Sequence, residues 1–103
     1  MKKVVETNKI IERVIFLRWY RGYVAALRHQ AERENDWDRV GSLNKRTDKL
    51  CEQCYSLEQL LFNENVLNED EWTTFYNDGD TSWAEGYKFG EREIKCQYLE
   101  SEG

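Results

Sequence analysis

Three cysteines and a single histidine are the residues in this sequence that are best suited to binding a metal ion. Cys51 and Cys54 form a CxxC pair. His29 and Cys96 raise the number of possible ligands to four, the number that a structural zinc ion takes. However, the pair lies within a continuous helical pattern without a glycine-bearing turn, and Cys54 falls where a small apolar residue would pack. We therefore predict no cofactor and keep metal binding by these four residues as an alternative.

The sequence lacks the other patterns that accompany catalysis or ion binding. Residues 78–82 resemble the start of a calcium-binding loop, but Trp83 and Phe89 occupy the positions that such a loop gives to glycine and glutamate. The chain has no glycine-rich phosphate loop, and no serine or cysteine stands beside a candidate base. We therefore predict that the protein is not an enzyme.

Arginine and aromatic residues are interspersed through residues 18–28, where no acidic residue occurs. Burying an unpaired arginine is prohibitive, so these arginines must reach solvent, an acidic partner or carboxylates of the second half. The candidate carboxylates are Glu52, Glu58, Glu85, Glu91 and Glu93. We expect pairing within the chain first. Aromatic and arginine side chains also dominate the energetics of protein interfaces. On this basis the predicted partner-binding residues are Arg18, Trp19, Arg21, Tyr23, Arg28, Trp72 and Trp83.

The two halves of the chain carry opposite charge. Residues 1–50 hold twelve Lys and Arg against seven Asp and Glu, a balance of +5, and residues 51–103 hold three against thirteen, a balance of −10. A basic surface is therefore expected to meet an acidic one. The sequence leaves open whether they meet within one molecule, between copies or across a partner. The acidic half could also imitate nucleic acid in a cationic groove of another protein.

Length and composition indicate a single domain over residues 1–103. With 40% hydrophobic and 14% aromatic residues, a chain of 103 residues can bury a core without a metal or a disulfide. Its apolar runs are too short for a signal peptide or a membrane span. Three cysteines, an odd number, are expected to be reduced thiols, which favours a cytoplasmic protein that does not contact a membrane.

Hydrophobic periodicity predicts two long helices in the first two thirds of the chain. Apolar residues recur at spacings of three and four across residues 9–33 and again across residues 38–63, with a polar loop between them. Asp36, Asp38 and Ser42 are candidate N-caps of the second helix, and Asn63 or Asn65 could take the left-handed position that closes it. Because two long helices joined by a short loop pack in opposite directions, we predict a long antiparallel αα-hairpin.

Capping signals predict two shorter helices in the last third of the chain. Two residue pairs have the spacing of a capping box, Asn68 with Glu71 and Ser82 with Glu85. The helices that they would open are predicted over residues 69–77 and 82–98. Asp78 and Gly79 are expected to end the first of these helices. The predicted fold is therefore all-α, with two shorter C-terminal helices packed on the hairpin.

The first predicted helix carries two apolar stripes on nearly opposite sides. Val14 and Leu17 belong to one stripe, and Trp19 and Ala26 belong to the other. Each stripe must be covered, either by other helices of the same chain or by a second molecule, and the sequence leaves both possibilities open.

Three glycines suggest where helices could approach closely. Gly86 and Gly90 lie one turn apart in the last predicted helix, where each costs up to about 1 kcal/mol relative to alanine. Such a cost suggests close approach of another backbone. Our hypothesis is that Gly22 in the first helix is the matching small residue.

These features favour a small non-enzymatic protein that acts through protein–protein interactions, as an adaptor or an inhibitor, and that forms a homo-oligomer. The alternative is a nucleic-acid-binding module that uses the arginine and aromatic residues of the first helix. The net charge of −5 and the pI near 4.9 weigh against that alternative. In its length and lack of proline, the chain also resembles small accessory proteins of bacteriophages.

Overall fold

The computed structural model describes the backbone of residues 2–102 and the side chains of residues 6–97. It consists of three helices, α1 (Lys2–Arg33), α2 (Trp37–Asn63) and α3 (Glu69–Glu102). Short connections at residues 34–36 and 64–68 join them, and the described residues contain no strand. The molecule measures 54 × 24 × 21 Å. Its long dimension is close to the ~51 Å that a straight helix of the length of α3 spans.

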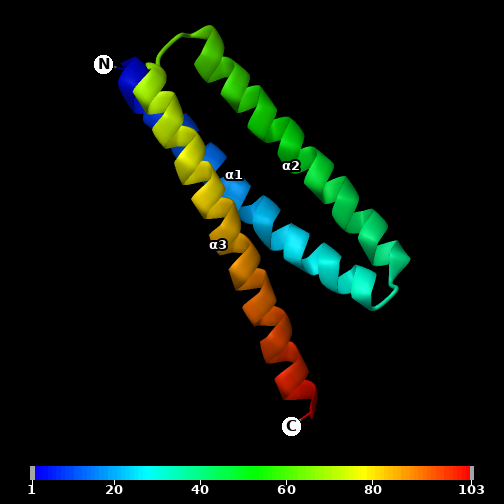
Figure 1. Cartoon of the computed structure of the whole chain (residues 1–103). Coiled ribbons are helices and arrows are strands. Elements are labelled where there is room, and N and C mark those ends of the chain that lie inside the picture. The colour runs from blue at the N-terminus through cyan, green and yellow to red at the C-terminus, as the bar shows by residue number, and fades with distance from the viewer. Residues whose placement is uncertain (1, 103) are drawn as a thin grey trace.

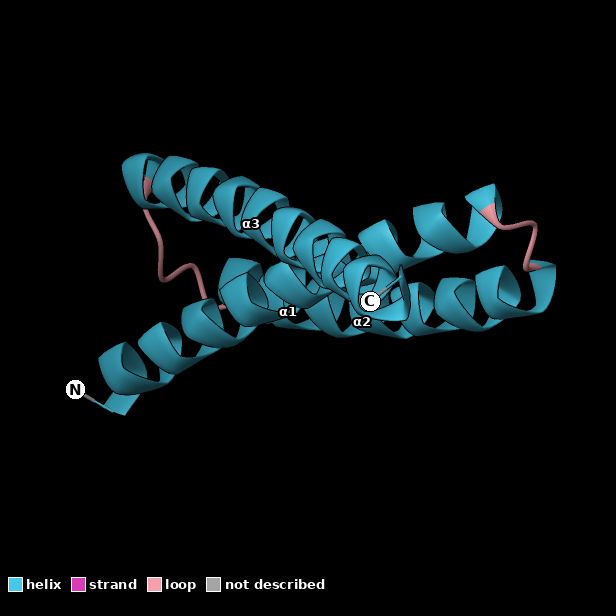
Figure 2. Ribbon diagram, turned by 90° about the horizontal axis from the view of Figure 1, so that it is seen from below, coloured by secondary structure: helices cyan, strands magenta, loops and turns pink. Residues whose placement is uncertain are grey.

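α1 is the central element, as Figures 1 and 2 show. It packs on α2 and on α3, whereas α2 and α3 do not approach one another's backbones over residues 2–102. Both apolar stripes of α1 therefore have a helix of the same chain against them. The core consists of two clusters of buried residues. One contains Leu17, Val24, Ala31, Leu43, Leu50 and Cys54, and the other contains Val14, Leu61, Leu67 and Phe75.

α2 packs along α1. Contacts between them occur in reverse order along the chain, with Arg28 near Asn44, Tyr20 near Arg46 and Arg18 near Glu58. The side chain of Asp36 accepts a hydrogen bond from the backbone N–H of Arg39 at 3.3 Å, which confirms Asp36 as the N-cap of α2. Asn65 adopts the left-handed conformation after the end of α2, with φ of 51°, as predicted.

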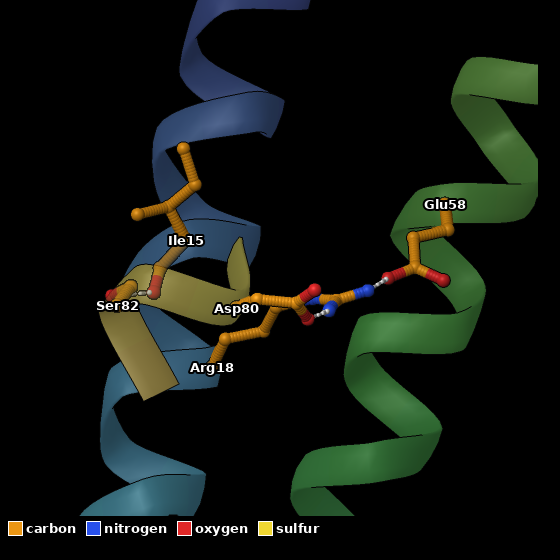
Figure 3. A network of polar contacts seen from close by, with 5 residues as sticks. All are labelled: Ile15, Arg18, Glu58, Asp80 and Ser82. Atoms are coloured by element: carbon orange, nitrogen blue, oxygen red, sulfur yellow. Dashed lines mark hydrogen bonds and ion pairs between the residues drawn. The ribbon is translucent and has the colours of Figure 1, made fainter. Parts of the chain in front are cut away.

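α3 is one continuous helix, so the prediction of two shorter C-terminal helices is wrong. The capping box at its start is confirmed, because Glu71 N–H donates to Asn68 Oδ1 at 2.8 Å and Asn68 N–H donates to Glu71 Oε1 at 3.0 Å. The second box does not exist. Ser82 lies inside the helix, and its hydroxyl donates to the backbone carbonyl of Ile15 on α1 at 2.9 Å (Figure 3).

Gly79 also lies inside α3 and does not end it. The side chain of Arg18 passes over this residue, and a Cβ on Gly79 would stand 2.6 Å from Arg18 Cδ. A glycine within a helix costs about 1 kcal/mol, but packing along the whole length of a partner helix outweighs this local preference. α1 is likewise longer than predicted, because it begins at Lys2 rather than at residue 9.

The backbones of α1 and α3 touch at glycines, which confirms the glycine hypothesis. A Cβ on Gly22 would overlap the carbonyl oxygen of Trp83, and a Cβ on Gly86 would overlap that of Trp19. A Cβ on Gly90 would lie 2.7 Å from the Cβ of Ala26. Ser82 of α3 bonds to Ile15 of α1, and Gly90, farther along α3, lies against Ala26, farther along α1. α3 therefore runs in the direction of α1 and crosses it closely.

Candidate functional site

Arg18 lies between all three helices and is paired inside the molecule. Its Nη2 donates to Glu58 Oε1 of α2 at 2.8 Å, and its Nη1 lies 3.5 Å from Asp80 Oδ1 of α3 (Figure 3). The guanidinium carbon also lies 5.7 Å from the centre of the Tyr76 ring. The side chain is only 16% exposed. The predicted pairing of an α1 arginine with Glu58 is therefore confirmed, and the charge of Arg18 is satisfied within the chain.

The other two predicted arginines also face α2. Nη1 of Arg28 lies 3.4 Å from Asn44 Oδ1, and its Nε lies 3.6 Å from Glu32 on the next turn of α1. Arg21 lies beside Cys54. Burial raises the pKa of the Cys54 thiol, and the interaction with Arg21 opposes this rise only in part. These arginines thus line the α1–α2 contact.

Aromatic side chains form a second, more open surface, which we call the aromatic face. Three rings of α1 are spaced by four and three residues, Phe16, Tyr20 and Tyr23, with ring centres 6.4 and 6.0 Å apart. Trp19 stacks on Tyr23 at 5.8 Å, and Phe89 of α3 lies 5.3 Å from Trp19. Phe16 and Phe89 remain 51% and 46% exposed. The aromatic face therefore presents large apolar rings to solvent.

Three arginines surround the aromatic face, and we call them the basic rim: Arg13, Arg39 and Arg46. The guanidinium of Arg13 lies 5.5 Å from the centre of the Phe16 ring, a cation–π geometry. Arg46 of α2 donates to the hydroxyl of Tyr20 at 3.2 Å. Arg39 is close enough to Tyr23 to act on its pKa. Cations from both α1 and α2 therefore stand around the rings.

Tyr23 connects the aromatic face to α3 through a polar contact. A hydrogen bond to the Glu93 carboxylate, together with burial, raises the pKa of Tyr23 to about 12. The nearby positive charge of Arg39 acts in the opposite direction. Tyr23 is therefore a neutral hydrogen-bond donor at physiological pH, held in position by α3.

The two predicted tryptophans of α3 lie elsewhere. Trp83 stacks on Tyr87 at 5.4 Å, and the Tyr87 hydroxyl shares a 2.6 Å hydrogen bond with His29 Nδ1. Trp72 stacks on Tyr76 at 5.7 Å and packs against the core cluster that contains Leu61. The structure thus divides the predicted binding residues among several places. Only Trp19 and Tyr23 lie on the aromatic face.

The predicted partner-binding residues lack six residues of this surface: Arg13, Phe16, Tyr20, Arg39, Arg46 and Phe89. A signal for part of it was available, because Arg13, Phe16, Tyr20 and Tyr23 recur at spacings of three, four and three. No sequence pattern shows that Arg46 and Phe89 come from other helices to join them.

The four candidate zinc ligands are separated. Cys54 is buried in the core, Cys51 is half-buried on α2, and Cys96 is exposed on α3, while His29 bonds to Tyr87. Within the residues that the structure describes, no three potential metal ligands lie close enough together to hold an ion. His29, Cys51, Cys54 and Cys96 therefore do not come together around one ion position.

An acidic groove lies between α1 and the start of α3. Its apolar floor consists of Ile11, Leu67 and Phe75, and it is bordered by Asp70, Glu71, Thr74 and Asp78. Its volume is about 290 Å³. The sequence contains no lysine or arginine from residue 50 to residue 87, so the ionisable side chains that α3 contributes to the border of this groove are all carboxylates.

The chain matches no family model, and comparisons with curated proteins and with solved structures find no similar protein. None of the helices, as far as the structure describes them, combines the length and apolar character that crossing a bilayer would require.

Proposed function

We propose that this chain is a small non-enzymatic interaction protein, of the adaptor or inhibitor type, whose main binding surface is the aromatic face with its basic rim. The observation that carries this proposal is the contact of aromatic rings with arginines, at the half-exposed Phe16 with Arg13 and at the partly buried Tyr20 with Arg46. Aromatic and arginine side chains are the residue types that contribute most to binding at protein interfaces.

The helices hold this surface in a fixed shape, which lowers the entropic cost of binding. In this proposal α1 and α2 act as an antiparallel hairpin. The hydrogen bond from Arg46 of α2 to the hydroxyl of Tyr20 of α1 holds the basic rim against the aromatic face. Phe89 adds a ring from α3. A partner would meet side chains that are already ordered.

The chemistry of the surface suits a partner with both apolar and acidic groups. Exposed rings gain from burial against apolar side chains, and arginines bind carboxylates bidentately and speed the encounter with an acidic protein. The three free cysteines fit a reducing compartment, so we propose that the protein works in the cytoplasm.

The test compares matched variants in binding. Phe16→Ala/Phe89→Ala removes the two most exposed rings of the aromatic face. The control Tyr55→Ala/Phe62→Ala removes two rings that are 64% and 67% exposed on α2. Proteins retained by the immobilised wild type and by the control, but not by the Phe16→Ala/Phe89→Ala variant, are then purified and titrated. We expect the face variant to bind at least about tenfold more weakly. Equal binding by all three proteins would contradict the proposal.

Nucleic-acid binding is the second candidate, because arginines placed against aromatic rings are also typical of proteins that bind single strands. An oligonucleotide titration at several salt concentrations distinguishes the two functions. A linear fall of log affinity with log salt, lost in Arg39→Glu/Arg46→Glu, would support nucleic acid as the ligand. Absence of binding at low salt would exclude it.

A further inference from the structure

The two oppositely charged halves of the chain meet sparingly inside the molecule. Among the described side chains, the ion pairs found between the halves are those of Arg18 with Glu58 and Asp80. The basic rim and the carboxylates of the acidic groove are instead exposed: Arg13, Arg39, Arg46, Asp70, Glu71 and Asp78. Opposite charges therefore remain available to another molecule on two separate surfaces.

These two surfaces lie along the same side of α3. Glu71 and Asp78 are seven residues apart, and Phe89 follows Asp78 by eleven residues. At about 100° per residue, the three side chains leave α3 in nearly the same direction. This side of the molecule therefore changes from acidic near the start of α3 to aromatic and basic farther along.

We propose that a second copy of this chain is the partner of the aromatic face, and that the basic rim of each copy lies against the acidic groove of the other. This inference rests on the proposed function and names its partner. When two copies are related by a two-fold axis and point in opposite directions, the acidic groove of each copy faces the basic rim of the other. The exposed rings of Phe16 and Phe89 then meet the apolar floors of the grooves.

The symmetry makes the assembly a closed dimer, because the same pair of contacts is made twice and no complementary surface is left over. A stable interface buries roughly 800 Å² on each partner. The chain exposes 7471 Å² in total. An interface of ordinary size would therefore require about a tenth of the surface of each copy, from the aromatic face, the basic rim and the groove.

The first experiment measures molar mass by sedimentation equilibrium of the full chain over a range of protein and salt concentrations. The expected result is a monomer–dimer equilibrium that weakens by about tenfold or more from low to high salt, because exposed charges are screened. A strict monomer at all protein concentrations in low salt would overturn the inference. It would leave the proposed function to its own binding test with the aromatic-face variant.

The second experiment exchanges the charges of the two surfaces. Arg39→Glu/Arg46→Glu and Asp70→Lys/Asp78→Lys are each expected to be monomeric, because each brings like charges together. An equimolar mixture of the two is expected to form a mixed dimer, since the altered surfaces complement one another and so do the unaltered ones. Circular dichroism melting tests whether both variants are folded.

A matched control changes the same amount of charge elsewhere. Lys88→Glu/Lys95→Glu lies on the exposed outer side of α3 and should dimerise as the wild type does. A dimer that survives Arg39→Glu/Arg46→Glu, or a mixture that stays monomeric, would overturn the placement of the interface. If the Phe16→Ala/Phe89→Ala variant is monomeric, as the charge variants are, the aromatic rings and the charges belong to one interface.

Discussion

α1 makes two contacts of different kinds. Toward α2 the contact is a seam of side chains, in which Leu43, Leu50 and Leu61 fill the space between two helices. Toward α3 it is a contact of backbones, made possible by Gly22 and Gly86. The α1–α2 contact therefore depends on side chains that fill the space between the helices, whereas the α1–α3 contact depends on the lack of a Cβ at these glycines.

The largest effect is expected from removing atoms in the seam. Leu61 is 1% exposed, and Leu61→Ala should lower the free energy of unfolding by about 2–5 kcal/mol, because it leaves a cavity among Val14, Leu67 and Phe75. Urea unfolding followed by circular dichroism measures the loss. Leu60→Ala, at a 44% exposed position next to it, should cost less than about 1 kcal/mol. Equal losses would contradict the assignment of Leu61 to the core.

Adding a single methyl group should disrupt the contact between α1 and α3. Gly86→Ala is expected to lower the free energy of unfolding by about 1–3 kcal/mol, because the new Cβ overlaps the backbone of Trp19. This loss would appear despite the better helix propensity of alanine. Gly41→Ala on α2 is the matched control, since nothing lies within 4 Å of the added Cβ, and it should raise stability by about 0.5–1 kcal/mol. A stabilising Gly86→Ala would mean that the helices are not in backbone contact.

A smaller effect is expected from the hydrogen bond that joins α3 to α1. Ser82→Ala removes the donor to the Ile15 carbonyl and should cost about 0.5–1.5 kcal/mol. Thr73→Ala removes a hydroxyl that bonds only to Glu69 of its own helix, so thermal melting should show a smaller change. The reverse order would argue against the role of Ser82 between helices.

The smallest effect is a pH dependence at the α1–α3 contact. The ordinary pKa of tyrosine is 10.0, and that of Tyr23 is about 12 in the folded chain. Between these pH values the unfolded chain loses the Tyr23 proton and the folded chain keeps it, so the folded state is stabilised less as pH rises. The stability difference between wild type and Tyr23→Phe should therefore fall from pH 10 to pH 12. Glu93→Gln should remove most of this dependence, and its persistence would contradict the Tyr23–Glu93 contact.

The sequence predicted those features of the fold that local chemistry determines. The Asn68–Glu71 box caps α3 because both partners lie within four residues of one another. The Ser82–Glu85 pair has the same spacing but lies inside α3, which continues through both residues, and the Ser82 hydroxyl donates to the carbonyl of Ile15 instead. Local spacing cannot reveal a bonding partner that lies 67 residues away in the sequence.

Glycine supported two different predictions, a close backbone contact at Gly86 and a helix end at Gly79, and only the first is correct. The cost of Gly86 in a helix indicated a close backbone, and the structure confirms this. The predicted helix end at Gly79 is wrong, because this glycine lies inside α3 and leaves room for the side chain of Arg18. The distinction depends on what lies opposite each residue, and periodicity within one helix carries no such information.

The candidate site was predicted only in part, for a similar reason. Arginines 18, 21 and 28 were identified by their position on α1, but they face α2, where Arg18 pairs with Glu58. The arginines that meet the aromatic face include Arg46, which reaches Tyr20 from another helix. Charge alone identifies residues that need partners, and only the packing of helices decides which partners they find.

The central position of α1 has a consequence for local opening of the molecule. A backbone amide of α2 or α3 can exchange its hydrogen after one helix contact opens, whereas an amide in the middle of α1 stays covered until both have opened. Amide exchange should therefore be slowest around Val24, which is fully buried. If α2 detaches first, the remaining pair of α1 and α3 forms a cooperative unit of its own, held together where glycine allows two backbones to meet.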